Sequence, residues 1–223
     1  MSSAIAISIL GCGWTGKALQ QHLEAQGYTV QCLSRDIEAN QAQGYYTCDT
    51  LVIAIPPRGE YLAVLDETLG RLEMGTQVVL LSSVSYYDGK ALVVEGEDLV
   101  RRLWLDAVVL RLGGLMGVDR IAGKYTAGKT LPHDSMSNYV YREDVVGVIA
   151  AVIVQEVRAE VLDVVAPVQH PKSEIFAANA ERFGFWQTVF DSLECRGKEI
   201  SSRRLEERLG YTFHYPDVDD FWG

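Results

Sequence analysis

The stretch ISILGCGWTGKALQQHL, residues 7–23, is the feature that most limits how this chain can fold. An apolar run meets three glycines in the pattern G-x-G-x-x-G, and a segment of helical period follows. In this pattern Gly11 permits a tight turn, Gly13 lets the backbone approach a pyrophosphate, and Gly16 allows a helix to pack closely on the strand. The pattern predicts a dinucleotide-binding turn, while a turn whose glycines serve geometry alone is the alternative. The cofactor-binding residues predicted here are Gly11, Cys12, Gly13, Trp14, Thr15 and Gly16.

Along the rest of the chain, apolar runs typical of buried strands alternate with segments of helical period. The predicted strands cover residues 5–10, 29–33, 51–55, 77–81, 107–112 and 161–165, with a brief extra strand at 45–47. The predicted helices cover residues 16–26, 61–72, 97–105, 142–155, 173–183 and 201–209. This alternation predicts the α/β class, with a doubly wound, mostly parallel sheet covered by helices on both faces. We expect a single domain over residues 1–223, with a small C-terminal substrate-side lobe from about residue 167.

The composition argues against several classes of function. The formal net charge is −10 and no basic block is present, which disfavours a nucleic-acid or anionic-membrane surface. The histidines are isolated and the cysteines lack C-x-x-C spacing, so we expect no metal site, and reduced thiols at Cys12, Cys32, Cys48 and Cys195. The N-terminal apolar run is broken by Gly11, which predicts a first strand and neither a signal peptide nor a membrane span. We therefore expect a cytoplasmic protein.

The residues that follow the second predicted strand bear on the choice of cofactor. A hydroxyl and a guanidinium, Ser34 and Arg35, stand where an NAD site usually has an acid for the ribose hydroxyl. Because arginine pairs bidentately with phosphate, the two residues favour NADP, with NAD as the alternative through Asp36. Three further cofactor contacts are predicted after the next buried strand, at Ile55, Pro56 and Pro57.

Several motifs together resemble the short-chain dehydrogenase/reductase superfamily, and most closely its extended and atypical branch, which is NAD-dependent epimerase/dehydratase-like. They are ILGCGWTG, VIAIPP, LLSSVSYYDG, VVLRLGGLMG, NYVYREDVV and KEISSRRLEERLGYTFHYPD. The resemblance implies a Rossmann-type fold with a dinucleotide lying across the carboxyl ends of the strands. It also implies a serine and a Tyr-x-x-x-Lys helix that carry out proton transfer beside the nicotinamide.

The chain departs from this family in its catalytic residues. Ser83 matches the family's catalytic serine, and Ser82 beside it is a predicted cofactor contact, although both could instead satisfy backbone groups. The interval 91–106 should carry the Tyr-x-x-x-Lys pair but contains neither residue type. Tyr86 and Lys90 have this spacing, yet the residues between them are typical of a turn, so we do not expect a shared helical face. Tyr86 remains a candidate proton donor.

The segment 116–141 is the best candidate for a substrate-side loop. It offers Tyr125, His133 and Asn138, each of which could equally be a solvated residue or a brace for the backbone. We expect Asp144 to cap or brace the helix that follows.

Three functions follow from these observations. The first is an NADP-dependent oxidoreductase or epimerase that acts on a small polar or sugar-like substrate through Ser83 and a tyrosine. The second is a catalytically silent protein that senses NADP(H) or scaffolds a partner, because the Tyr-Lys pair is absent. The third is an enzyme that uses His133 as its acid or base. We expect a monomer or homodimer with a small-molecule ligand.

Overall fold

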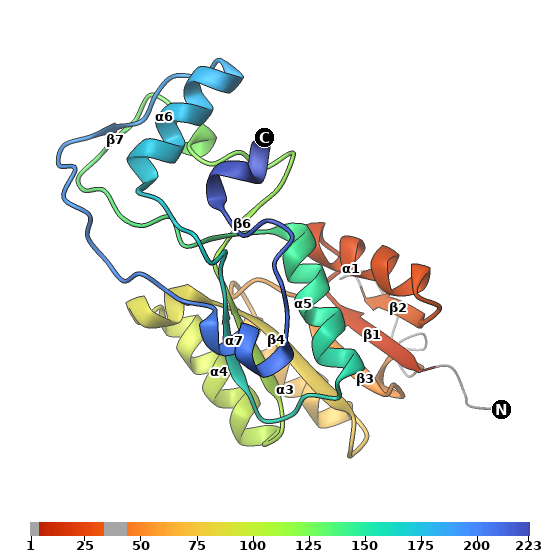
Figure 1. Cartoon of the computed structure of the whole chain (residues 1–223). Helices are drawn as coiled ribbons and strands as arrows, with labels where there is room; N and C mark the ends of the chain where they lie inside the picture. Colours follow the sequence, from red (N-terminus) through yellow and green to blue (C-terminus); the bar gives the residue numbers. More distant parts are fainter. Residues whose placement is uncertain (1–4, 34–43) are drawn as a thin grey trace. The chain divides into compact units, whose positions relative to one another are not determined.

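The computed structural model describes residues 5–33 and 44–223. Contacts within the chain divide it into two compact units (Figure 1). The first unit comprises residues up to 111 together with 146–162, and the second comprises residues 112–145 and 163–223. The second unit contains the segment from residue 167 that was expected as a C-terminal lobe, and it also takes in residues 112–145 and 163–166.

A six-stranded sheet dominates the structure. In chain order its strands are β1 (Ala6–Leu10), β2 (Thr29–Leu33), β3 (Thr50–Ile53), β4 (Gln77–Ser83), β5 (Val108–Leu112) and β9 (Val161–Val164). Their spatial order is β2-β1-β3-β4-β5-β9, and the β1–β2, β1–β3 and β3–β4 pairs are parallel. The predicted α/β class with a mostly parallel, doubly wound sheet is confirmed. Because the direction of winding reverses between β1 and β3, the carboxyl ends of these two strands mark the place where such sheets bind ligands.

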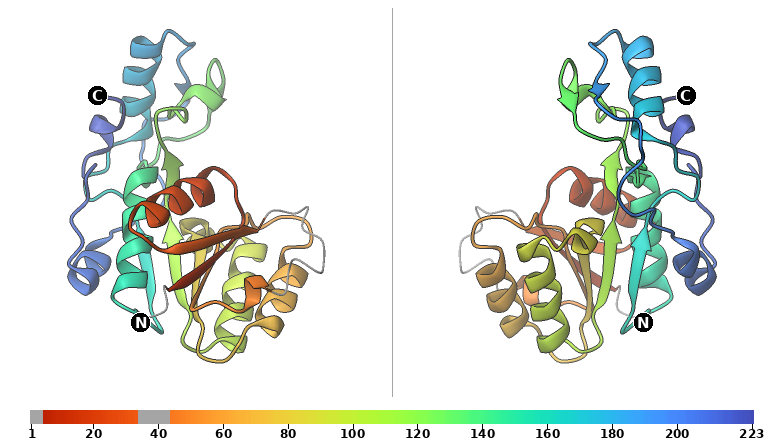
Figure 2. Two further views of the ribbon diagram at one scale, coloured as in Figure 1. Left: turned by 90° about the vertical axis from the view of Figure 1, so that its right-hand side faces the viewer. Right: turned by 90° about the vertical axis from the view of Figure 1, so that its left-hand side faces the viewer.

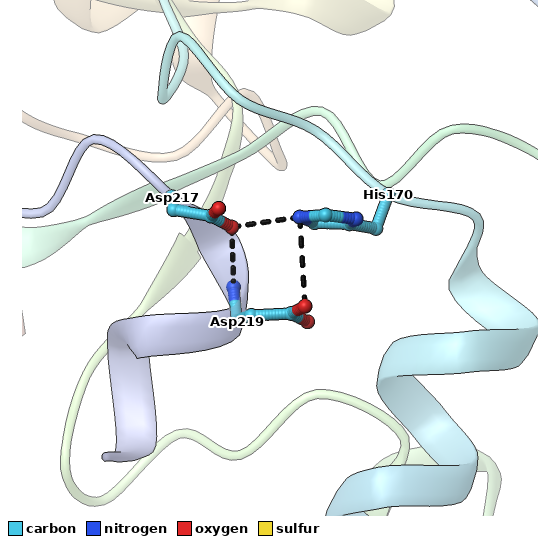
Figure 3. Close-up of side chains that lie close together, drawn as sticks. All are labelled: His170, Asp217 and Asp219. Carbon is cyan, nitrogen blue, oxygen red and sulfur yellow. Dashed lines mark hydrogen bonds and ion pairs between the residues drawn. The ribbon is translucent and has the colours of Figure 1, made fainter.

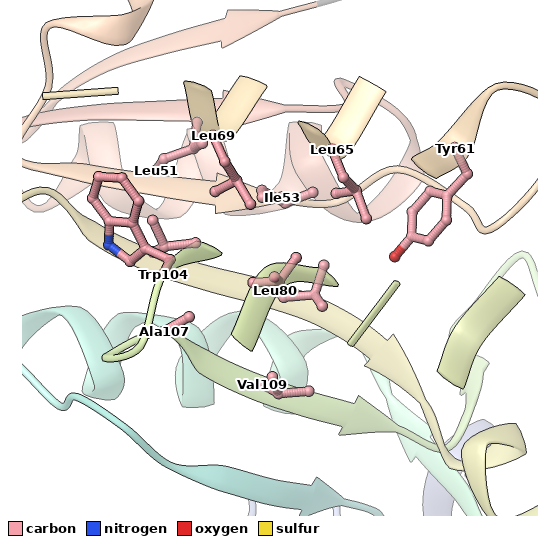
Figure 4. Close-up of a cluster of buried hydrophobic side chains, with 11 residues drawn as sticks. Leu51, Ile53, Tyr61, Leu65, Leu69, Leu80, Trp104, Ala107 and Val109 are labelled. Carbon is pink, nitrogen blue, oxygen red and sulfur yellow. The ribbon is translucent and has the colours of Figure 1, made fainter. Parts of the chain in front are cut away.

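Helices cover both faces of the sheet in the first unit. They are α1 (Trp14–Ala25), α3 (Tyr61–Arg71), α4 (Ala91–Leu103) and the part of α5 (Arg142–Val154) that falls in this unit. Figure 2 shows α3 and α4 on one face and α1 on the other. Leucines and isoleucines of α3 and the strands meet the indole of Trp104 in one buried cluster (Figure 4). Burial of the Tyr61 ring in this cluster raises the pKa of its hydroxyl to about 12, and the nearby Glu97 adds to the shift.

Two of the predicted elements differ in the structure. The brief strand expected at residues 45–47 is wrong, because residues 44–46 form a helical turn. The carbonyl of Tyr45 in this turn accepts a hydrogen bond from the Ser8 hydroxyl at 2.7 Å, so the segment lies against β1 without extending the sheet. Helix α4 begins at Ala91, six residues before the predicted start at Glu97. Its first turn is an unbroken apolar run, Ala91 to Val94, and Gly96 follows, so this part of the sequence shows no helical period.

The second unit combines small parallel strand pairs with short helices. Strand β6 (Gly114–Met116) pairs with β8 (Tyr139–Tyr141), and β7 (Thr130–Leu131) pairs with β10 (Val189–Phe190). The helices entirely within this unit are α6 (Lys172–Phe183), α7 (Arg203–Leu209) and the 3-10 helices η2 (Lys124–Thr126) and η3 (Val218–Trp222). An aromatic core joins β8 to the C-terminal segment, with the rings of Tyr141 and Tyr215 at a centroid distance of 4.0 Å. None of the helices in the described residues is long and apolar enough to cross a bilayer.

Asp144 braces a different segment from the one expected. Its fully buried carboxylate accepts hydrogen bonds from the backbone amides of His214 and Tyr215 at 2.7 and 2.9 Å, and from the Tyr211 hydroxyl at 3.0 Å. Burial and the adjacent carboxylate both raise the pKa of Tyr211. The residue therefore fixes the C-terminal segment within the second unit instead of capping α5 through its own turn.

Candidate functional site

The turn between β1 and α1 is built around two glycines that no other residue could replace without movement. Gly11 has a φ of +110°, and a Cβ atom there would lie 2.7 Å from the carbonyl oxygen of Ala54. A Cβ on Gly16 would lie 2.1 Å from the carbonyl oxygen of Gly11. The first glycine thus lets the residues after β3 approach the turn, and the second lets α1 pack closely on it, as the sequence predicted for Gly16.

Gly13 differs from its two neighbours in the motif. It has φ −80° and ψ −156°, which any residue can adopt, and a Cβ atom there would meet nothing within 4 Å. It is the N-cap of α1, and no side chain caps the helix at this position. The first turn of α1, which starts at Trp14 and Thr15, therefore presents backbone N–H groups and the positive end of the helix dipole beside an open space.

The residues after β3 complete this edge of the first unit. A Cβ on Gly11 would also lie 3.1 Å from Cγ2 of Ile55, so Ile55 lies next to the turn, and its contact with a cofactor stays a prediction. Ile55 packs against the buried cluster, while Pro56 and Pro57 are exposed. The turn and the Ile55 segment therefore meet at the reversal point between β1 and β3, where doubly wound sheets hold their ligands.

Cys12 and Cys32 form a disulfide, so the expectation of reduced thiols is wrong for this pair. Their Cα atoms are 5.7 Å apart, although the residues are 20 positions apart in sequence. The physical reason is strand pairing: Cys32 is aligned with Ile9 in the β1–β2 register, and Cys12 lies two residues after the end of β1. Cys48 and Cys195 are free thiols.

At the end of β4 a buried ion pair occupies the position next to the predicted catalytic serine. The guanidinium of Arg111 binds both carboxylate oxygens of Glu97, with an Nη2–Oε2 distance of 2.7 Å, and the side chains are 9% and 1% exposed. Ser82 donates its hydroxyl to the same carboxylate at 2.6 Å. Ser82 is thereby engaged with protein, and its predicted contact with a cofactor stays a prediction. Sequence reasoning missed Glu97 and Arg111, although a lone arginine in the apolar strand VVLRL signals a buried acidic partner.

Two tyrosines extend this network, which we call the serine–arginine cluster: Ser82, Ser83, Tyr86, Tyr87, Glu97 and Arg111. The guanidinium carbon of Arg111 lies 3.5 Å from the centroid of the Tyr86 ring, a close cation–π contact. Its Nη1 donates to the Tyr87 hydroxyl at 3.1 Å. Burial acts to lower the pKa of Arg111, but its bonds to Glu97 and Tyr87 outweigh burial and raise it, so the group stays charged.

Tyr86 lies in a short 3-10 helix, η1 (Val84–Asp88), and Ser83 is the N-cap of this helix. The Ser83 hydroxyl oxygen caps η1 by accepting from the backbone amide of Ser85 at 3.2 Å and from its hydroxyl at 3.0 Å. The helix ends at Gly89, with a left-handed φ of 69°, and Lys90 is the N-cap of α4. Tyr86 and Lys90 therefore do not share a helical face, as expected from the turn-like residues between them. Ser34 and Arg35, which were expected to select between NADP and NAD, lie outside the described residues.

The three substrate-side candidates belong to the second unit. Tyr125 is 74% exposed. His133 is exposed, and its Nε2 atom lies 3.1 Å from Nη1 of Arg196. Asn138 has a φ of +44° and clamps the segment 198–200, because its amide nitrogen donates to the carbonyl of Lys198 and its amide oxygen accepts from the amide of Ile200. The reading of Asn138 as a backbone brace is the one that its hydrogen bonds support.

A further polar cluster of the second unit joins the loop before α6 to the C-terminal segment (Figure 3). Nε2 of His170 lies 2.7 Å from Oδ1 of Asp217 and 3.6 Å from Oδ2 of Asp219. One nitrogen of His170 and one carboxylate oxygen of each aspartate all lie within 4.8 Å of one another, a grouping that the spacing of the histidines in the sequence did not indicate. Asp217 also caps η3 by accepting from the amide of Asp219 at 3.0 Å, so hydrogen bonding within the cluster accounts for its geometry.

No protein-family profile matches the chain. It is 26% identical to Protein YeeZ of Escherichia coli K12, over 95% of this chain and 96% of that protein. A putative NAD-dependent epimerase/dehydratase from Methylobacillus flagellatus superposes with a TM-score of 0.77 at 21% identity, covering 99% of this chain and 97% of that one. Human epimerase family protein SDR39U1, solved with NADPH, superposes with a TM-score of 0.75 at 17% identity, covering 98% of each chain. The resemblance seen in the motifs is confirmed for the fold, which is that of the epimerase/dehydratase and short-chain dehydrogenase/reductase proteins.

Proposed function

We propose that this protein binds a nicotinamide dinucleotide at the turn between β1 and α1, and that it prefers NADP(H) to NAD(H). The observation that carries the proposal is the contrast among the three glycines. Gly11 and Gly16 are explained by packing, but Gly13 has ordinary backbone angles and empty space where a side chain would stand. A turn whose glycines served geometry alone would have no need of glycine at position 13.

The residues around Gly13 fit the pyrophosphate of a dinucleotide. The N-terminal amides of α1 carry no side-chain cap and offer hydrogen-bond donors to phosphate oxygens. Such local donors are required, because the chain carries a net charge of −10 and its overall field repels anions. The names of the structural neighbours support the same cofactor class, since one is called NAD-dependent and another was solved with NADPH. The preference for NADP(H) rests on the sequence Ser34-Arg35.

Binding is tested by titrating the purified protein with NADPH and with NADH while following tryptophan fluorescence, to which Trp14 in the turn contributes. Gly13→Val should weaken binding at least about tenfold, because the side chain occupies the space left for phosphate. The same variant should keep the fold, with a loss of about 1 kcal/mol or less from helix capping. Gly70→Ala in α3 is the matched control, since its Cβ also meets nothing within 4 Å. Absence of saturable binding in the wild type, or wild-type affinity in Gly13→Val, contradicts the proposal.

The cofactor preference has its own test. Arg35→Ala should weaken NADPH binding far more than NADH binding, because only NADPH carries the 2′-phosphate that a guanidinium would pair with. An equal loss for both dinucleotides would contradict the role given to Arg35.

A second candidate function is an oxidoreductase or epimerase acting on a small polar or sugar-like molecule. A bound nicotinamide supplies a hydride donor or acceptor. Ser83, the N-cap of η1, and Tyr86 within η1 are half-buried residues, and their hydroxyls could hydrogen-bond a reacting oxygen. Against this candidate, Ser83 already caps η1, the Tyr86 ring lies against Arg111, and no lysine shares a helical face with Tyr86. We therefore place dinucleotide binding first, as a sensing or scaffold function, and catalysis second.

The two candidates are separated by measuring NADPH oxidation with a panel of small aldehydes, ketones and nucleotide sugars. Turnover that is lost in Ser83→Ala, while NADPH affinity is kept, supports catalysis. No turnover in any assay, with intact dinucleotide binding, supports the sensing or scaffold function. The expected cytoplasmic location and the small-molecule ligand stay predictions.

A further inference from the structure

We propose that Cys12 and Cys32 form a reversible thiol–disulfide modification site that sets the affinity of the turn for its dinucleotide. This inference rests on the proposed function, because it assigns a role to a covalent bond inside the proposed binding turn. Cys12 lies between Gly11 and Gly13, and Cys32 is the next-to-last residue of β2. The bond therefore crosses from the middle of the glycine motif to the neighbouring strand.

The disulfide is not needed to hold the two strands together. Strands β1 and β2 are already paired in parallel over five residues, from Ala6 with Thr29 to Leu10 with Leu33. The amide of Gly11 continues this pairing by donating to the carbonyl of Leu33 at 3.0 Å. What the bond adds is a tie at residue 12, which lies beyond the last paired residue of β1.

The position of both cysteines allows exchange with thiols in solution. Both residues are partly exposed, unlike the fully buried Ile9 with which Cys32 is aligned. A thiolate can attack one sulfur of such a bond, so that a mixed disulfide forms and the other cysteine leaves as thiolate. A second thiolate then releases the remaining cysteine. In total, two electrons pass from a dithiol to the protein, which yields two cysteine thiols and the oxidised dithiol. The reverse reaction requires a disulfide of the same class.

The direction of the effect follows from the geometry of the turn. In the disulfide form the turn already has Gly11 at its positive φ and Gly13 as N-cap of α1, so its amides are placed before a ligand arrives. Fixing a loop in its binding conformation lowers the entropy that binding must remove. The disulfide form should therefore bind the dinucleotide more tightly, and reduction should weaken binding. Since coupling between two sites is reciprocal, bound dinucleotide should in turn protect the disulfide from reduction.

The experiment compares the full chain in its oxidised form with the same chain reduced by dithiothreitol, with NADPH and NADH titrated by tryptophan fluorescence. Mass spectrometry after thiol alkylation verifies the state of each cysteine. We expect the dissociation constant to rise at least about threefold on reduction. Cys12→Ser/Cys32→Ser should match the reduced wild type and be indifferent to dithiothreitol. Cys48→Ser/Cys195→Ser is the matched control, and it should keep the full response because it removes only the free thiols.

A second readout needs no substitution and so does not depend on how the variants fold. The ratio of oxidised to reduced dithiothreitol at which half of the wild-type protein is reduced should fall in the presence of saturating NADPH. The expected factor equals the ratio of the two dissociation constants.

Equal affinity in the two forms, tighter binding after reduction, or no disulfide in the oxidised chain would overturn this inference while dinucleotide binding stands. Absence of saturable binding in both forms would overturn the proposed function as well, so the two failures are distinguishable.

Discussion

The glycine turn and the serine–arginine cluster follow β1 and β4 of the same sheet and differ in how their polar groups are used. In the turn, three of the six residues 11–16 are glycine, and no side chain caps the backbone amides at the start of α1. In the cluster, polar side chains are numerous, but Ser82, Glu97 and Arg111 bind one another. The difference teaches that the proposed ligand site depends on backbone geometry, while the polar groups beside the predicted catalytic serine bind one another.

The largest expected effect on stability comes from removing the ion pair at the centre of the serine–arginine cluster. Glu97→Gln leaves the buried guanidinium of Arg111 without its carboxylate, and loss of one partner of a buried ion pair costs about 3–5 kcal/mol. Urea unfolding should show this loss, whereas Glu95→Gln on the exposed side of α4 should change the free energy of unfolding by less than about 0.5 kcal/mol. If Glu97→Gln were as stable as the wild type, the cluster would not be the internal support described above.

The second-largest effect on stability is expected in the glycine turn, from Gly16→Ala. The added Cβ would lie 2.1 Å from the carbonyl oxygen of Gly11, and because the contact is with backbone, the turn and helix must shift. We expect a loss of about 2–3 kcal/mol in unfolding free energy, together with loss of dinucleotide binding. This outcome differs from that of Gly13→Val, which should lose binding with at most about 1 kcal/mol of unfolding free energy. Unchanged NADPH affinity in Gly16→Ala would show that the turn geometry is unrelated to binding.

A smaller effect on the cluster is expected from Ser83→Ala. Its hydroxyl oxygen caps η1 through the amide of Ser85, and loss of such a cap costs about 1 kcal/mol. Thermal and urea unfolding should report this change, while the dissociation constant for NADPH stays within twofold of the wild type. Loss of NADPH affinity in this variant would indicate that Ser83 contacts the cofactor, which would contradict the assignment of binding to the turn alone.

The smallest expected effect is that of Tyr86→Phe. The ring over the Arg111 guanidinium is kept, so the cation–π contact persists and stability should change by less than about 0.5 kcal/mol. Tyr86→Leu removes the aromatic face and should cost about 1 kcal/mol more in a parallel measurement. A turnover that vanishes in Tyr86→Phe at unchanged stability would instead give the hydroxyl a chemical role.

The turn was predictable from sequence because its requirements are steric and local. Gly11 and Gly16 are needed where backbone atoms approach each other, and this need recurs wherever a strand, turn and helix pack in this way. The cluster was only partly predictable. Arg111 in an apolar strand demands a buried acid, but the choice among Glu95, Glu97 and Asp98 depends on the phase of α4, and the predicted start of that helix was six residues late.

The disulfide was not predictable from spacing. Rules based on C-x-x-C spacing detect cysteines that are close in sequence, whereas Cys12 and Cys32 are brought together by the register of two parallel strands separated by a helix. Similarly, the partners of Asp144 lie about 70 positions away in the C-terminal segment, which no local capping rule reaches. Contacts of this kind follow from the topology of the fold, and they can be predicted only when the pairing of strands and segments is known.

The path of the chain between its two units has a consequence for how the protein is made. The first unit is encoded in two pieces, up to residue 111 and 146–162, and the second unit in the pieces that follow each of them. During synthesis, β5 must therefore wait for its outer neighbour β9 until residues 112–145 of the other unit have left the ribosome. For the same reason, no single truncation of the chain yields either unit by itself.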